Sequence, residues 1–117
     1  LHWPGRVQDK DENGNRIRRK AAWKALEGCY DKGWARAIGV SNFSEHHMRQ
    51  LEADGCKVRP MVNQFEASVF LQQSMILQYC QEHNICIVLG GAYNSGILAS
   101  DLGPDATDPD LDLDPGP

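Results

Sequence analysis

Short runs of apolar residues alternate along this chain with segments whose apolar residues recur at helical spacing. The runs cover residues 35–40, 61–65 and 85–89, and the last is rich in β-branched residues. Apolar residues stand at consecutive positions in these runs, so we expect both faces of each strand to be buried. A parallel sheet covered by helices is the α/β fold class that this pattern predicts.

Three segments have the spacing of amphipathic helices, over residues 19–33, 44–55 and 72–83. Ser44 stands at an expected N-cap, because its hydroxyl can accept a hydrogen bond from the first turn. Gly33 is the expected stop of the first helix. Residues 5–18 are polar and contain the turn dipeptide Asn13-Gly14, so we predict a long loop there.

The order of these elements is compatible with two architectures. Residues 1–4 have the pattern of a strand end, which makes the chain look like a fragment that begins within a sheet. An open doubly wound sheet and an arc of a (β/α)8 barrel both continue in this order. A flavodoxin-like open sheet needs a Gly-rich phosphate loop after its first strand, and residues 5–14 supply none. A full barrel takes roughly 250 residues, so this chain would form about half of one.

Charge is concentrated at the carboxyl end of the chain. The formal net charge is −4, and residues 101–117 hold six aspartates and no Lys or Arg. The rest of the chain is therefore nearly neutral, which argues against nucleic acid as a partner. The cluster Arg16, Arg18, Arg19 and Lys20 is the one candidate for binding phosphate, and we expect it to be a solvated loop and helix start.

Composition also predicts the domain organisation and the compartment. We expect residues 1–99 to fold and the Asp/Pro/Gly-rich residues 100–117 to form a disordered or extended tail. No run reaches the roughly 18 apolar residues of a membrane helix, and no signal-peptide pattern opens the chain. The cysteines are not paired as C-x-x-C, which favours a reducing, cytoplasmic setting with neither disulfides nor a metal site. They are Cys29, Cys56, Cys80 and Cys86.

Polar side chains gather at the predicted carboxyl ends of the strands, where parallel α/β folds place their working residues. These ends are His2-Trp3, Ser41-Asn42, Asn63-Gln64 and Gly90-Gly91. Hydroxyl and amide groups suit a neutral polar ligand such as a carboxamide, and none of these ends carries a carboxylate for a metal. A histidine such as His2 is the side chain among them that can move a proton near neutral pH.

The chain resembles the aldo-keto reductase family. The matching runs, in family order and spacing, are LHWP (1–4), WKALE (23–27), RAIGVSNFS (36–44) and VNQFE (62–66). The segment GGAYNSGIL (90–98) is similar to the sugar-dehydrogenase branch of that family. The resemblance implies a (β/α)8 barrel of which this chain supplies strands 4 to 7. It also implies hydride transfer between NAD(P)H and a carbonyl, with NADP(H) expected and NAD(H) left open.

The resemblance assigns roles to individual residues. His2 matches the histidine that orients the substrate carbonyl, and Trp3 matches a tryptophan of the substrate pocket. Ser41, Asn42 and Gln64 match the residues that hold the nicotinamide carboxamide. Holding the carboxamide fixes which face of the nicotinamide ring meets the carbonyl.

The resemblance also marks what this chain lacks. Gly90 occupies the cofactor-side position where the family often has a stacked tyrosine. The family's catalytic tyrosine, with its aspartate and lysine, would precede Leu1, and the residues that grip the 2′-phosphate would follow Pro117. We therefore expect an inactive fragment of a reductase for small carbonyl or sugar substrates. A non-catalytic, nicotinamide-binding regulatory subunit of the same fold is the alternative, and the oligomeric state is open.

Overall fold

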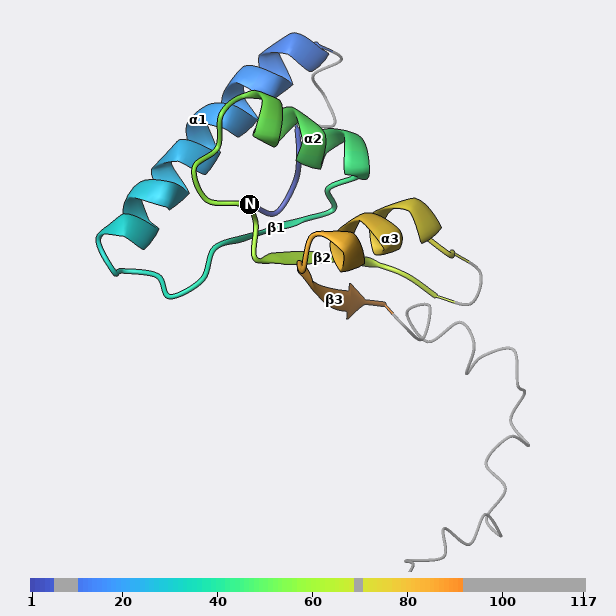
Figure 1. Cartoon of the computed structure of the whole chain (residues 1–117). Helices are drawn as coiled ribbons and strands as arrows, with labels where there is room; N and C mark the ends of the chain where they lie inside the picture. Colours follow the sequence, from blue (N-terminus) through green and yellow to red (C-terminus); the bar gives the residue numbers. More distant parts are fainter. Residues whose placement is uncertain (6–10, 69–70, 92–117) are drawn as a thin grey trace, which may run out of the picture.

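The computed structural model describes residues 1–5, 11–68 and 71–91. Its elements are α1 (Glu12–Asp31), β1 (Gly39–Ser41), α2 (Glu45–Ala53), β2 (Val62–Glu66), α3 (Ser74–Glu82) and β3 (Cys86–Gly90). The strands pair in parallel in the order β1-β2-β3. All three helices lie on one face of this sheet (Figure 1). An open doubly wound sheet carries helices on both faces, so the arrangement is that of a barrel arc.

The first residue continues the sheet on the far side of β1. The amino group of Leu1 donates to the carbonyl of Gly39 at 2.8 Å. The amide of Ser41 in turn donates to the carbonyl of Leu1 at 2.7 Å. This is the bonding of neighbouring parallel strands, and it agrees at Leu1 with the strand end predicted for residues 1–4.

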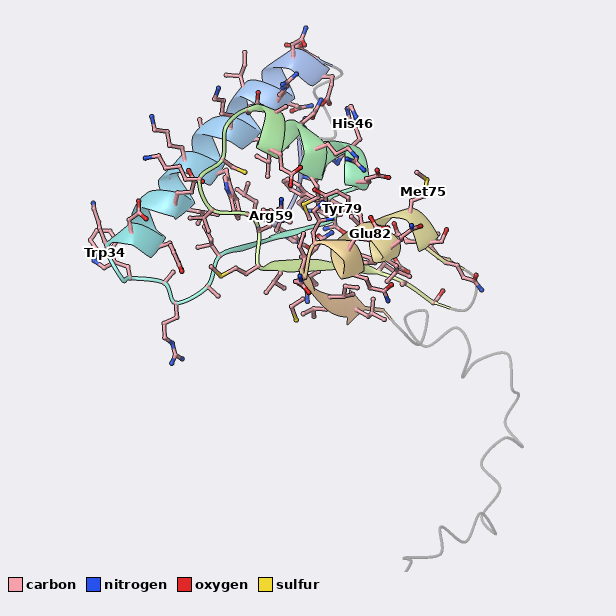
Figure 2. The ribbon with its side chains drawn as sticks, in the orientation of Figure 1. Trp34, His46, Arg59, Met75, Tyr79 and Glu82 are labelled. Carbon is pink, nitrogen blue, oxygen red and sulfur yellow. The ribbon has the colours of Figure 1, made fainter. Side chains whose placement is uncertain are left out.

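The core lies between the helices and one face of the sheet. The side chains that form it include Trp23, Val40, Phe43, Met48, Phe65, Tyr79 and Cys80, all buried. Figure 2 shows Tyr79 in the middle of the molecule, where α3 meets α2.

The opposite face of the sheet, which would line a barrel, is open to solvent. The prediction that both faces of the strands are buried is wrong for β3. Val88, on the open face beside Gln64, is 38% exposed, and Leu89, on the helix side beside Phe65, is 49% exposed. Within the described residues, helices cover only one side of the sheet.

Helix α1 begins earlier than the sequence pattern predicts. The predicted loop over residues 5–18 is wrong from Glu12 onward, where the helix starts. The buried side of this first part is polar, because Asn15 and Arg19 are buried while Ile17 is 69% exposed. The helical recurrence of apolar residues, which predicts a helix from sequence, is therefore missing over the first turns of α1.

The other predicted boundaries are close to the observed ones. Gly33 follows α1 with a φ of +71°, the left-handed conformation expected of a helix stop. The strand predicted over residues 35–40 begins only at Gly39. Trp34, which follows this stop, is 74% exposed and has the Lys32 ammonium 4.6 Å from its ring centre.

Helix α2 begins with the predicted Ser44 cap, extended by His47. The His47 amide donates to the Ser44 hydroxyl, and the Ser44 amide donates to His47 Nδ1 at 3.2 Å, a capping box. Nδ1 can accept this bond only when it carries no proton. Burial, and then the charge of Arg19, lower the pKa of His47 from its ordinary value, while Glu12 acts in the opposite direction.

No helix in the described part of the chain is long and apolar enough to cross a membrane.

We expect His47→Gln to reduce the pH dependence of stability. Because the folded pKa of His47 is lowered, the unfolded chain takes up the proton first. The stabilising contribution of neutral His47 is then complete above about pH 6.5 and is lost as the pH falls below that value. Glutamine fits a capping box and does not titrate. Urea unfolding on both sides of that pH should show a smaller difference for His47→Gln than for the parent chain; an equal difference contradicts the assignment.

We expect Gly39→Ala to destabilise the fold by about 1–3 kcal/mol through overpacking. A Cβ at Gly39 would lie 2.7 Å from the carbonyl oxygen of Val62 and 2.9 Å from its Cβ. Gly28→Ala is the matched control, since a Cβ there meets nothing within 4 Å and alanine favours a helix by about 0.5–1 kcal/mol. Urea unfolding should therefore give changes of opposite sign, and a stabilising Gly39→Ala would contradict the close approach.

Candidate functional site

The residues singled out in the sequence line one hollow at the carboxyl ends of the strands. Its volume is about 300 Å³, and its lining includes His2, Trp3, Ser41, Asn42, Gln64, Phe65, Glu66, Gly90 and Gly91. The strand register brings them together, because Ser41 pairs with Gln64, and Glu66 pairs with Gly90. All six predicted site residues are thus neighbours, although they come from segments far apart in the sequence.

The turn after β1 aims Asn42 into this hollow. Asn42 has a φ of +60°, a left-handed conformation that asparagine tolerates better than most residues. Its backbone amide donates to the carbonyl of Gln64 at 2.8 Å. This bond ends the pairing of β1 with β2 and fixes the turn against the neighbouring strand.

A short chain of hydrogen bonds joins the three segments of the hollow. The Ser41 hydroxyl donates to the Gln64 carbonyl at 2.8 Å. The Asn42 side-chain amide donates to the His2 carbonyl at 3.0 Å and to the Ser41 hydroxyl oxygen at 3.1 Å. Within the described residues, the Asn42 side-chain oxygen and the Gln64 side-chain amide have no hydrogen-bond partner and remain available to a ligand.

His2 and Trp3 are presented on an exposed segment. Both are exposed, Trp3 at 56%, and their rings stack with centres 5.2 Å apart. Their own side chains are not buried in the core, so their positions depend on the backbone that carries them.

The hollow also contains a carboxylate that the sequence did not predict. Strand β2 continues past Gln64 to Glu66, which is exposed and lines the hollow. The expectation that no strand end carries a carboxylate is therefore wrong. The available signal was the two-residue period of a strand, which puts Gln64 and Glu66 on the same face. No group of three or more His, Cys, Asp or Glu suited to a metal ion occurs among the described residues.

The predicted pair Asn63-Gln64 is divided between the two faces of the sheet. Asn63 is fully buried, and its side-chain amide donates to the carbonyl of Phe43 at 3.0 Å. Asn63 therefore ties the segment after β1 to β2 from the core side. Gln64 is exposed on the other face, within the hollow.

The groups in the hollow fit a carboxamide. A carboxamide presents N–H donors and a carbonyl acceptor, and the Asn42 oxygen and Gln64 amide supply complementary groups. A Cβ at Gly90 would meet nothing within 4 Å, so this glycine leaves open space beside the same residues. An opening of about 300 Å³ is at the lower end of the range for small-molecule sites.

Relatives of this chain share its sequence over most of its length. The sequence model of the Aldo/keto reductase family matches residues 1–112. A 9,11-endoperoxide prostaglandin H2 reductase of Trypanosoma cruzi (strain CL Brener) is 42% identical over 102 residues, covering 84% of this chain and 32% of that protein. Aldo-keto reductase family 1 member D1 of Mus musculus is 40% identical over 91 residues, covering 73% of this chain and 28% of that protein. The chain spans about a third of the length of these relatives.

Solved structures agree with the barrel arc. An aldo-keto reductase enzyme from a Medee basin deep-sea metagenome library superposes with a TM-score of 0.67 at 32% identity, covering 88% of this chain and 35% of that one. The aldo/keto reductase of Brucella melitensis has a TM-score of 0.68 at 23% identity, over 80% of this chain and 33% of that one. This match shows a likeness in fold. The fold is thus part of a (β/α)8 barrel, and the chain belongs to the aldo/keto reductase family.

Proposed function

We propose that this chain carries the nicotinamide-holding and carbonyl-facing residues of an NAD(P)H-dependent carbonyl reductase. The observation that supports this most is the gathering of all six predicted residues around one hollow at the strand ends. Family membership supports the same class of chemistry. A small aldehyde, ketone or sugar is the substrate class that we propose, in the cytoplasm, with neither nucleic acid nor a membrane as a partner.

Each residue has a distinct part in this proposal. The Asn42 side-chain oxygen and the Gln64 amide hold the carboxamide, while Ser41 keeps the Asn42 amide in place through its hydroxyl oxygen. The cofactor, when bound, supplies the hydride. His2 donates a hydrogen bond to the carbonyl oxygen of the substrate, and Trp3 forms a wall of the substrate pocket. Fixing both partners in this way lowers the entropic part of the barrier.

We propose further that the isolated chain does not turn over. It covers about a third of its relatives, and the sheet face that carries Gln64 and Glu66 is open to water. Excluding water from a site strengthens the polar contacts that hold the reacting groups and prevents side reactions. The described strands do not enclose the hollow, so a bound cofactor would remain in contact with solvent.

Titration of the full chain with NADPH, followed by nicotinamide fluorescence, tests the cofactor grip. We expect weak, saturable binding that Asn42→Gly and Gln64→Ala each weaken about fivefold, the effect of one lost neutral hydrogen bond. Glycine is preferred to alanine at Asn42 because it tolerates the left-handed backbone. Gln72→Ala, which removes an exposed glutamine outside the hollow, is the matched control and should bind normally.

The other outcomes of this titration are equally informative. Binding that is unchanged in both site variants would refute the grip, as would an absence of binding by a folded chain. Tight binding without oxidation of NADPH by an added aldehyde would favour the non-catalytic binding subunit. Oxidation of NADPH by the parent chain would contradict the proposed inactivity and leave the grip intact.

A further inference from the structure

The segment that carries His2 and Trp3 is held by its backbone carbonyls. The carbonyl of Leu1 accepts from the amide of Ser41, and that of His2 accepts from the side chain of Asn42. The carbonyl of Pro4 accepts from the guanidinium of Arg19 at 2.6 Å. We propose that Arg19 is a positioning residue, which sets where His2 and Trp3 lie in the site.

The side chain of Arg19 is buried between segments of the fold and does not lie on the surface. Its side chain is 3% exposed. Besides the Pro4 carbonyl, the guanidinium donates to Glu12 in the first turn of α1 and to the side-chain oxygen of Gln50 in α2. Glu12 neutralises its charge, and the planar fork serves three acceptors from three segments, a geometry that Lys cannot reproduce.

The contact at Pro4 is reinforced one residue later. A Cβ at Gly5 would lie 2.7 Å from the side chain of Asn15, so the backbone of Gly5 packs directly against α1. Asn15 is itself buried. Trp3 therefore lies between two anchored carbonyls. The Asn42 side-chain amide holds that of His2, and Arg19 holds that of Pro4.

A second arginine of α1 provides a natural comparison. Arg16 also links α1 to α2, through a two-point contact with Asp54 at 2.8 and 3.0 Å. Its side chain is 41% exposed, and its partner Asp54 is at the end of α2 rather than on residues 1–5. The cluster expected to be a solvated basic patch is thus divided between a helix–helix link and the Pro4 anchor.

Fluorescence of Trp3 tests this role. The Trp34→Phe background removes an exposed tryptophan (Figure 2), and Trp23 is only 1% exposed, so iodide reports on Trp3. We expect Arg19→Met to lower the anisotropy of Trp3 and to raise its iodide quenching. The rise should be at most about twofold, since 56% of Trp3 is already exposed. Arg16→Met, which removes a link between the same helices, should leave both signals at their parental values.

Graded variants separate positioning from general stability. Arg19→Lys should fall between the parent chain and Arg19→Met, because one ammonium can satisfy only part of the three acceptors. If circular dichroism shows that Arg19→Met does not fold, Arg19→Lys against Arg16→Lys makes the same comparison. Equal effects of the two arginine positions on Trp3, or no effect of Arg19, would overturn the proposal.

The importance of this anchor rests on the proposed function, in which His2 and Trp3 face the substrate. The fluorescence experiment contains no cofactor, however. A negative result would remove the role of Arg19 and leave the NADPH titration as the test of the site itself.

Discussion

The pairing of β1 with β2 is the interaction on which the site depends. Gly39 is in close contact with Val62, and this approach sets the register that places Ser41 beside Gln64. The same register lets the amide of Asn42 reach the carbonyl of Gln64. A shift by one residue would turn Gln64 toward the core and Asn63 toward the hollow. The proposed cofactor grip therefore depends on how closely the backbones of β1 and β2 approach each other at Gly39.

Helix α1 supports this pairing from both ends. Near its start, Arg19 holds the carbonyl of Pro4. Further along, one carboxylate oxygen of Glu27 accepts the amides of Lys57 and Val58 at 2.6 and 2.9 Å, and Trp23 donates to the carbonyl of Val58 at 3.0 Å. The first contact positions the segment with His2, and the second positions the entry to β2. One helix thus contacts both the segment that carries His2 and the approach to β2, which carries Gln64.

The sequence predicted those features that have a periodic or local signal. The parallel order, the Ser44 cap, the stop at Gly33 and the cluster of strand-end residues all follow from spacing or from single-residue preferences. The start of α1 could not be found in this way, because Asn15 and Arg19 form its buried side and polar residues carry no apolar period. The inclusion of Glu66 depended on where β2 ends, a boundary that apolar runs define poorly.

In the proposed function, the open face of the sheet separates the cofactor grip from a working site. The core that aligns the strands lies entirely on the helix side, where Trp23, Phe43 and Phe65 are buried. The grip residues lie at the ends of the strands and need only this core and the register to be correctly placed. The exposed face, with Gln64 and Glu66 in water, adds nothing to that placement. It governs solvent access, and hence the strength of each polar contact to a ligand, because a hydrogen bond in open water contributes far less than one in an enclosed site. An arc of the barrel can therefore have the geometry of the proposed grip. The low-dielectric surroundings that strengthen its polar contacts require the other strands of a barrel.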